Sequence, residues 1–267
     1  VRAGLTSVAD LGCGIGADAL AFAGAGLQVH AVDADEVTAA ITTYNLSPFP
    51  EATVSHGTAE ETDLSDVDSV YLDPARRTSG HTNTSRLSSS EDYSPSLDFA
   101  FSLAGKLPTG IKLGPGFDRD LIPDSCEAQW ISVNGDVVEV GLWFGSLKRN
   151  GITRAALIMN ADGMHELTAA ADSADAEVGD LEKFLYEPDG AVIRARLIGD
   201  LARSMGAHML DEHIAYMSSD VEMHSPFAAT FEVVQEYALD VKVLAKELKA
   251  RGIGTLEIKK RGVDIDP

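Results

Sequence analysis

The fold is decided by residues 8–35, VADLGCGIGADALAFAGAGLQVHAVDAD. A short apolar strand leads into a glycine-rich turn, an alanine-rich helix follows, and a second apolar strand ends at Asp33. This order is typical of half a nucleotide-binding βαβ unit. Gly12, Gly14 and Gly16 carry no Cβ that would block a ligand, and a helix that starts behind them has free N–H groups. The stretch therefore predicts a ligand site on the backbone of the turn.

The glycine pattern alone leaves the ligand open. Gly12, Gly14 and Ala17 also satisfy the dinucleotide fingerprint with alanine in third place, and a glycine turn can simply let a helix pack on a sheet. Two carboxylates favour a different ligand. Asp10 precedes the turn, where it would repel a pyrophosphate and attract a ligand that carries an ammonium and a sulfonium. Asp33 follows the turn at close to the usual spacing of about 20 residues and can accept hydrogen bonds from both hydroxyls of a ribose.

The motifs DLGCGIG and VDAD resemble the first two motifs of class I S-adenosylmethionine (SAM) methyltransferases. The resemblance implies a Rossmann-like α/β sheet and SAM as the methyl donor. In that fold the residues just past the third strand, here expected at 52–55, meet the adenine. The family usually carries helices ahead of its first strand, so we expect such helices in a longer natural chain. The expected donor-binding residues are Asp10, Gly12, Gly14, Gly16, Asp33, Ala34, Thr58, Ala59, Glu60 and Asp73.

A fourth strand is expected at residues 67–72, and the sequence Asp-Pro-Ala-Arg follows it at 73–76. Ligands of open α/β sheets bind at the carboxyl ends of strands near the topological switch, which places this motif beside the glycine turn. In the resembled family an Asn/Asp-Pro-Pro-aromatic motif at this point accepts N–H bonds from an exocyclic amine of adenine or guanine. Asp73 and Pro74 match that motif, whereas Ala75 and Arg76 depart from it. The expected catalytic residues are Asp73, Pro74 and Arg76.

The departure leaves the base without its usual aromatic partner. The guanidinium of Arg76 could stack on the base or bind a phosphate, and Tyr93, in the serine- and threonine-rich segment 78–97, could supply a ring. The alternative for Arg76 and Arg77 is an ion pair with nearby acids. Segment 78–97 itself is expected to be a loop beside the site, either a substrate lid or an insertion without function.

The Asp-Pro-Ala-Arg sequence also resembles part of the Asp-Pro-Pro-Arg motif of enzymes that methylate carbon 5 of pyrimidines. That chemistry needs a cysteine nucleophile. Cys13 belongs to the glycine turn and Cys126 lies well past the expected fifth strand at 110–113, which disfavours this reaction. The two cysteines predict neither a disulfide framework nor a zinc site, and no HExxH or Cys/His cluster predicts another metal.

Composition sets limits on the class of protein. The 267 residues suffice for about two domains. An apolar content of 45% is ordinary for a globular protein. No apolar run of about 18 residues indicates a membrane span, and no signal peptide pattern opens the sequence. We therefore expect a cytoplasmic protein that is not in a membrane.

Charge is unevenly distributed along the chain. The formal net charge of −21 argues against non-specific nucleic-acid binding by the whole molecule. Residues 242–261 are the exception, with seven basic residues against two acids. This segment could contact the phosphates of RNA, or it could simply be a solvated helix face.

The C-terminal part resembles the THUMP-like domain found behind SAM methyltransferase domains in bacterial proteins. The resemblance rests on EPDGAVIRARLIGDLA, HIAYMSSD and LKARGIGTLEIKKRGVDIDP. We expect a methyltransferase domain at 1–170 and a smaller α/β domain at 171–267, joined by a small and acidic linker within 168–180. Because THUMP domains accompany RNA-modifying enzymes, the resemblance implies a role with RNA. The expected elements are strands at 127–133, 137–144, 152–159 and 164–167, a turn at 186–190, a helix at 191–204, extended stretches at 208–210 and 213–217, a strand at 231–237, a helix at 239–251 and a strand at 254–260.

Together these resemblances predict a SAM-dependent methyltransferase that acts on an exocyclic base nitrogen of RNA. Guanine N2 is slightly favoured, because the arrangement resembles trimethylguanosine-synthase-like enzymes. A small-molecule methyltransferase, favoured by the acidic charge, is one alternative. The other is a SAM-binding module that has lost catalysis and acts as an interaction partner. The expected substrate-binding residues are Arg76, Arg77, Tyr93, Lys259, Lys260 and Arg261.

Overall fold

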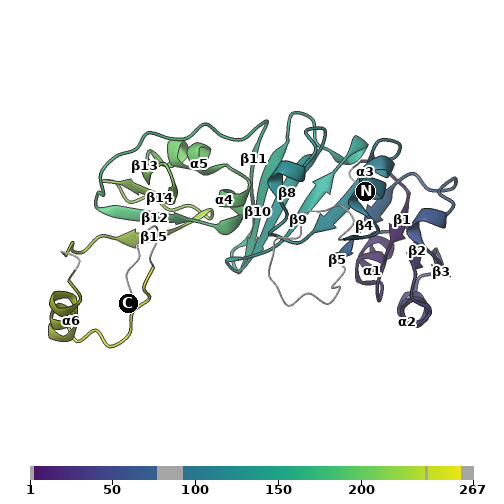
Figure 1. Ribbon diagram of the computed structural model, residues 1–267, viewed down its shortest axis with the longest axis horizontal. Coiled ribbons are helices and arrows are strands. Elements are labelled where there is room, and N and C mark those ends of the chain that lie inside the picture. The colour runs from purple at the N-terminus through teal and green to yellow at the C-terminus, as the bar shows by residue number, and fades with distance from the viewer. Residues whose placement is uncertain (1–2, 77–92, 238–239, 260–267) are drawn as a thin grey trace. The chain divides into compact units, whose positions relative to one another are not determined.

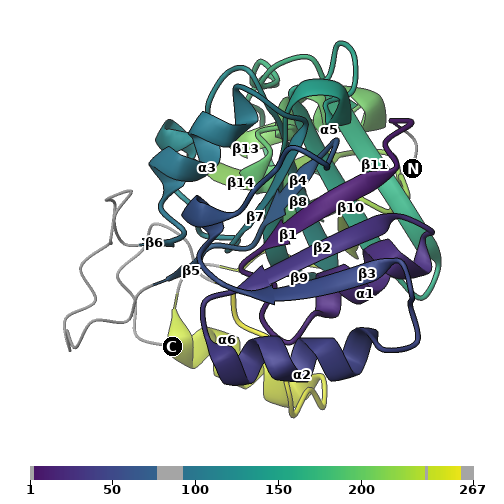
Figure 2. The ribbon, with the colours of Figure 1, turned by 90° about the vertical axis from the view of Figure 1, so that its right-hand side faces the viewer.

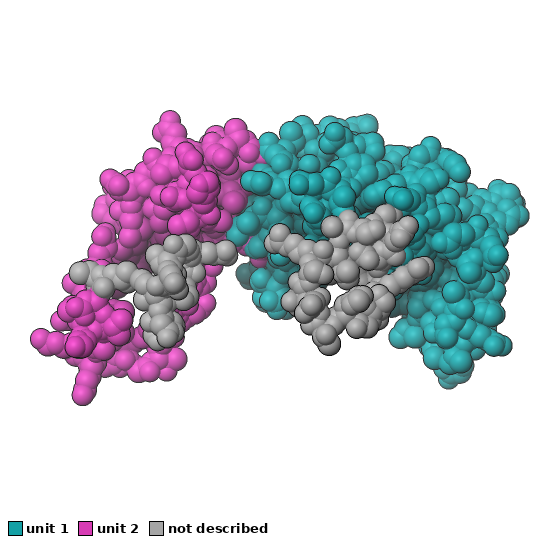
Figure 3. Space-filling view, viewed as in Figure 1, with its two compact units in different colours: residues 1–172, 190–197 teal, residues 173–189, 198–267 magenta. Residues whose placement is uncertain are grey.

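The structure, a computed structural model, describes residues 3–76, 93–237 and 240–259. The chain divides into two compact units (Figure 3). The first comprises residues 1–172 and 190–197, and the second comprises residues 173–189 and 198–267. Because residues 190–197 belong to the first unit, the units are not the continuous segments 1–170 and 171–267. In the described part of the chain, no helix has the length and apolar character that crossing a membrane needs.

The first unit is built on a nine-stranded sheet (Figures 1 and 2). From β3 to β7 the strands are parallel, β9 is antiparallel to both of its neighbours, and β10 is parallel to β8 and antiparallel to β11. This architecture confirms the expected Rossmann-like α/β class. In sheet order the strands are β11 (Gly163–Ala169), β10 (Arg154–Asn160), β8 (Glu127–Val133), β9 (Asp136–Trp143), β7 (Thr109–Leu113), β4 (Val70–Leu72), β1 (Ser7–Leu11), β2 (Gln28–Asp33) and β3 (Ala52–His56).

The strand order reverses between β1 and β4. The chain adds β2 and β3 on one side of β1 and then returns to place β4 and β7 on the other side. Leu11, the last residue of β1, pairs with Leu72, the last residue of β4. The residues that follow these two strands are therefore neighbours at the carboxyl edge of the sheet, which is where open α/β sheets bind ligands.

Helices cover both faces of this half of the sheet. α1 (Ala17–Gly24) and α2 (Glu36–Leu46) lie on one face and α3 (Leu97–Ala104) on the other (Figure 2). Small side chains let α1 approach the strands, with Ala19 and Ala23 buried in a cluster that includes Val29. The side chain of Asp35 caps α2, accepting a hydrogen bond of 2.8 Å from the N–H of Thr38.

Two hairpins extend the sheet as the sequence predicts. Asn134 and Gly135 both have positive φ, +52° and +92°, which is the geometry of a tight hairpin turn between β8 and β9. β10 and β11 form the second hairpin, ending at the Asn160–Gly163 pair. These hairpins place β8, β10 and β11 beyond β9, an order that the sequence pattern could not supply.

The second unit has a four-stranded antiparallel sheet of its own. Its centre is Tyr186, whose buried hydroxyl accepts a hydrogen bond from the N–H of Met223 and donates one to the carbonyl of Val221. In sheet order the strands are β13 (His208–Asp211), β14 (Ile214–Ser219), β12 (Phe184–Pro188) and β15 (Ala228–Glu232). α5 (Ile198–Met205) packs near β13, whereas α6 (Val241–Ala250) has no buried residue.

Four local expectations for the C-terminal half are wrong. The Pro-Asp-Gly signal predicted a turn at 186–190, but Tyr186 pairs with strands on both sides, and Glu187 and Pro188 continue the pairing with β15. The helix expected at 191–204 is divided into α4 (Gly190–Arg194) and α5, because Arg196 adopts a left-handed φ of +58°. The strand expected at 231–237 is β15, which ends at Glu232. Residues 253–259 form no strand.

Trp130→Ala should destabilise the first unit more than Trp143→Ala does. Trp130 on β8 is 1% exposed and fills the core, whereas Trp143 on β9 is only partly buried. We expect losses in the free energy of unfolding of about 3–5 kcal/mol for Trp130→Ala. Urea denaturation followed by circular dichroism measures both variants. A larger loss for Trp143→Ala would contradict this description of the core.

Candidate functional site

The glycine turn joins the end of β1 to α1 and is tied to the neighbouring strand. The N–H of Gly12 donates to the carbonyl of Val32 at 2.8 Å. Gly14 and Gly16 have left-handed φ values of +55° and +85°. A Cβ on Gly16 would lie 2.8 Å from a methyl carbon of Thr42, whereas one on Gly14 would meet open space. The turn is therefore packed on α2 behind Gly16 and open at Gly14.

Asp33 lies beside the turn at the end of β2. Its Oδ2 accepts a hydrogen bond from the N–H of Gly14, and its Oδ1 accepts one from the N–H of Asp35, both at 2.9 Å. The N–H of Gly57 donates to the carbonyl of Asp33 at 3.0 Å, which attaches the chain after β3 to the same place. A carboxylate offers about four acceptor positions. Asp33 is therefore oriented by the backbone and retains acceptor capacity for hydroxyl groups.

The residues expected near a base follow β3 and lie in and before the short helix η1 (Ala59–Glu61). Ala59 is buried, while Ala34, Thr58 and Glu60 are exposed. The hydroxyl of Thr58 donates to Glu61 at 3.0 Å. Of the expected residues, only Thr58 lines a shallow pocket of about 290 Å³ here, and Ala34, Ala59 and Glu60 do not. The other lining residues of this pocket are His30, Val32, Ser55, His56, Gly57, Glu61, Thr62 and Asp63.

Asp10 is a buried acid in the middle of this edge. It lies on β1 between Ala31 of β2 and Tyr71 of β4 and is 1% exposed. Its Oδ2 has no hydrogen-bond partner within the described structure. Burial and, to a smaller extent, nearby Asp18 raise the pKa of Asp10 to about 7, although Lys112 opposes the rise. A buried acceptor without a partner suits a cationic ligand group, which would stabilise its charged form.

Lys112, on β7, links Asp73, which is an expected site residue, to Asp18, which is not. Its Nζ lies 2.6 Å from Asp18 of α1 and 2.8 Å from Asp73, which follows β4. Because Leu11 pairs with Leu72, Asp73 stands next to Gly12, as expected from the strand order. Neither Asp18 nor Lys112 is among the site residues expected from the sequence. Their proximity depends on sheet register between residues 94 positions apart in the chain.

The chain beyond Asp73 pairs with a segment that follows the serine-rich stretch. β5 (Ala75–Arg76) and β6 (Tyr93–Ser94) form a small antiparallel pair. Tyr93 is 5% exposed and packs edge-on against Phe117, with ring centroids 6.2 Å apart. Its ring is covered in this structure, so its packing gives no support to a stacking role. The side chain of Arg76, the whole of Arg77 and most of the expected loop lie outside the described residues.

The two cysteines are unsuited to nucleophilic catalysis. Both Cys13 and Cys126 are free and buried. Burial raises the pKa of Cys13 to about 12 and that of Cys126 to about 11. Neither thiol is ionised near neutral pH, which argues against methylation of pyrimidine carbon 5 through a cysteine adduct. The described residues contain no group of three or more side chains that could hold a metal ion.

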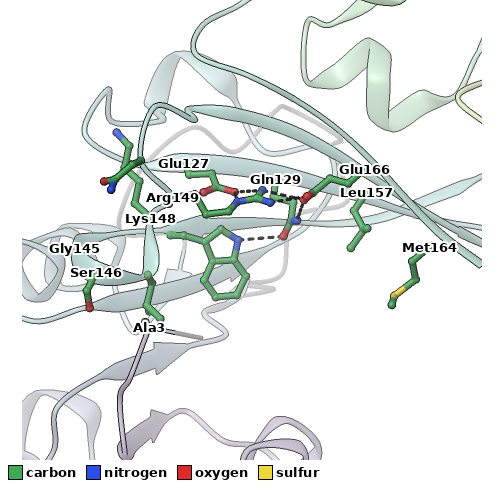
Figure 4. A pocket seen from close by; sticks show the side chains of 13 residues that line it. Ala3, Glu127, Gln129, Gly145, Ser146, Lys148, Arg149, Leu157, Met164 and Glu166 are labelled. Atoms are coloured by element: carbon green, nitrogen blue, oxygen red, sulfur yellow. Dashed lines mark hydrogen bonds and ion pairs between the residues drawn. The ribbon is translucent and has the colours of Figure 1, made fainter. Parts of the chain in front are cut away.

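A second hollow, a groove of about 970 Å³, lies on strands β8 to β11 (Figure 4). The guanidinium of Arg149 pairs there with the buried Glu127 and with Glu166. The indole N–H of Trp143 donates to Gln129 at 3.2 Å. These polar groups are paired with one another, whereas the buried Asp10 at the strand ends has an unpaired oxygen.

The basic C-terminal segment is only partly available for a ligand. Lys259 pairs with Glu187 and Glu257, and its Nζ lies 5.6 Å from the centre of the Phe231 ring. A phosphate that contacts Lys259, as expected from the sequence, would therefore have to displace these acids. Lys260 and Arg261 lie outside the described residues. The exposed lysines of α6 are Lys242, Lys246 and Lys249.

Comparison with known proteins relates the whole chain to methyltransferases. It is 31% identical over 264 residues to an uncharacterised SAM-dependent methyltransferase of Mycobacterium tuberculosis strain CDC 1551 / Oshkosh, covering 97% of this chain and 71% of that protein. The counterpart from strain H37Rv matches to the same extent. The model of the THUMP domain-like family matches residues 228–267, which confirms the resemblance for this part of the domain expected at 171–267.

The fold has a counterpart among solved structures. A crystal structure from Porphyromonas gingivalis W83, assigned as a methyltransferase, superimposes with a TM-score of 0.71 at 20% identity. The match covers 92% of this chain but 65% of the other, so this chain spans slightly less than two thirds of that protein's length. The likeness shows a shared fold.

Asp10→Asn should stabilise the ligand-free protein at pH 8. In the folded state the carboxyl group of Asp10 has a pKa of about 7, whereas its ordinary value is 3.8. Its contribution to the free energy of unfolding therefore falls as pH rises from about 4 to 7. The amide avoids that loss. We expect a gain of about 1–3 kcal/mol in the free energy of unfolding at pH 8 and much less at pH 5.

Urea denaturation at the two pH values measures the gain. Asp35→Ala is the matched control, because it removes an exposed helix cap and should lower stability at pH 8. If Asp10→Asn lowers stability at pH 8 as Asp35→Ala does, the ionised carboxylate of Asp10 does not destabilise the folded protein.

Proposed function

Because this chain belongs to the family of SAM-dependent methyltransferases, we propose that it transfers the methyl group of SAM to an exocyclic base nitrogen of RNA. The observation that carries the proposal is the position of Asp73. Its carboxylate follows β4, stands beside the glycine turn and is 44% exposed, so it is accessible to an acceptor that approaches the donor. A carboxylate accepts hydrogen bonds and cannot donate them when ionised, which suits the N–H groups of an amine.

The residues at the strand ends fit SAM. When bound, SAM supplies a methyl group on a positively charged sulfur, and it also carries an amino group and a ribose. Asp33 would accept hydrogen bonds from the ribose hydroxyls, since backbone N–H groups already orient it. The buried Asp10 would face the positive charge, and the open backbone at Gly14 would let the ligand approach. Thr58, Ala59 and the neighbouring Ala34 would line the base.

Asp73 and Pro74 would orient the acceptor. Methyl transfer is an in-line displacement, so alignment of the acceptor nitrogen and exclusion of water are the main tasks of the protein. Asp73 and the carbonyl of Pro74 would each accept an N–H of the amine, directing its lone pair toward the methyl group. Arg76 and Arg77 would hold the base or a phosphate.

Support for RNA as the acceptor comes from the C-terminal part. The THUMP domain-like match covers residues 228–267, and the resemblance to THUMP domains implies a role with RNA. Phosphate contacts position a protein on nucleic acid without reading its sequence. The exposed lysines of α6, together with Lys260 and Arg261, would provide such contacts. A small-molecule acceptor is the second candidate, favoured by the net charge of −21.

Asp33→Ala should weaken SAM binding. The change removes an oriented acceptor of two ribose hydrogen bonds, so we expect an affinity lower by about 10- to 100-fold. Isothermal titration calorimetry measures it. Asp35→Ala, which removes a helix cap two residues away, should leave the affinity within about threefold. Equal affinities for Asp33→Ala and the wild type would refute the ribose assignment.

The acceptor can be identified by incubating the protein with isotope-labelled SAM and either total cellular RNA or a metabolite extract. We expect label in RNA, on an amino nitrogen of a base. Asp73→Asn should still bind SAM but transfer the methyl group at least about 100-fold more slowly. Label found only in metabolites would reject the RNA acceptor, and full turnover by Asp73→Asn would reject the role of Asp73.

A further inference from the structure

Lys112 occupies a position between the two halves of the proposed site. Its ammonium contacts Asp18, in the first turn of the helix behind the glycine turn, and Asp73, in the motif after β4. The side chains are 23% exposed for Lys112, 33% for Asp18 and 44% for Asp73, so the ion pairs are partly shielded from water. Lys112 thus joins α1, the helix that follows the proposed donor-binding turn, to Asp73, the residue proposed to hold the acceptor.

Acids from four other parts of the first unit face this lysine. Asp10 extends from β1, Asp18 from α1, Asp73 from the end of β4 and Glu139 from β9. Burial raises the pKa of Asp10 and of Glu139, and Lys112 opposes the rise in both. Burial also works against the charge of Lys112, but hydrogen bonds to Asp18 and Asp73 hold its pKa above the ordinary value. Lys112 therefore stays charged among four carboxyl groups.

The contact with Asp73 involves one carboxylate oxygen in particular. Lys112 lies 2.8 Å from Oδ2, which leaves Oδ1 as an acceptor for an N–H of the substrate. Asp73 follows its strand rather than lying within it, and 44% of its side chain is exposed, so strand pairing does not fix its carboxylate. An ion pair to a residue on the adjacent parallel strand supplies that constraint.

We propose that Lys112 is a positioning residue with two roles. It fixes the Asp73 carboxylate for the acceptor amine, and it favours the ionised form of the buried Asp10, which attracts the cationic donor. The first role rests on the function proposed for Asp73. The second role concerns donor binding alone and does not depend on the identity of the acceptor. Neither role requires Lys112 to touch the reacting atoms.

The second role has a consequence for pH. In the wild type, SAM affinity should rise between pH 6 and 8 as Asp10 ionises, because the charged form attracts the cationic donor. Without Lys112, the remaining titratable groups that face Asp10 are the acids Asp18 and Asp73, the thiol of Cys13 and the hydroxyl of Tyr71. Ionisation of Asp10 then becomes harder, so the rise in affinity should move to higher pH.

The test compares Lys112→Met, Lys112→Gln and Lys112→Arg with the wild type. SAM affinity is measured by calorimetry from pH 6 to 9, and turnover is measured with labelled SAM and RNA. We expect Lys112→Met and Lys112→Gln to shift the affinity profile upward by about one pH unit and to lower kcat by about 10- to 100-fold. Lys112→Arg, which keeps the charge, should restore the profile and most of the turnover. Lys106→Met, at an exposed lysine after α3, is the matched control and should change neither measurement.

Three results would overturn the proposal. An unshifted affinity profile in both uncharged variants would exclude the role in donor binding. Turnover within twofold of the wild type would exclude the positioning of Asp73. Equal losses in Lys112→Arg and Lys112→Gln would show that packing, not charge, matters. If the wild type methylates no RNA, the proposed function fails, whereas the affinity profile still decides whether Lys112 controls the charge of the site.

Discussion

The burial of Asp10 among other acids is the constraint on which the rest of the site depends. A carboxylate that is 1% exposed, with one oxygen unpaired, raises the free energy of the folded protein whenever it is ionised. Asp18 and Asp73 add to that cost, and Lys112 offsets part of it. A donor with a sulfonium and an amino group would add positive charge beside these acids, so the feature that destabilises the empty protein would favour binding.

The order of the strands brings the other residues of the proposed site next to Asp10. Reversal of the chain between β1 and β4 places the glycine turn, Asp33 and Asp73 at one edge, although they come from different strands. Backbone N–H groups orient Asp33, and the side chain of Lys112 orients Asp73. The residues proposed to bind the donor and the acceptor are thus held by separate means, and Lys112 connects Asp73 to Asp18 at the start of α1.

The sequence predicted the features that depend on local pattern. Spacing around the glycine turn indicated Asp10 and Asp33, and Asn134–Gly135 indicated the β8–β9 hairpin. Features that depend on long-range register could not be read in this way. Lys112 meets Asp18 only because β7 lies next to β4, and Tyr93 is buried because Phe117 packs against it. Lys259 was expected to contact phosphate because it lies in a basic segment. Its acid partner Glu187 is on β12, where the Pro-Asp-Gly signal had predicted a turn.

A crystal structure of the protein with SAM bound tests the central claim most directly. The account predicts ribose oxygens within about 3.2 Å of the Asp33 carboxylate. It also predicts a positively charged group of SAM, sulfonium or ammonium, within about 4–6 Å of the Asp10 carboxylate. SAM bound away from the ends of β1 and β2, or bound there with its positive charges directed away from Asp10, would contradict it.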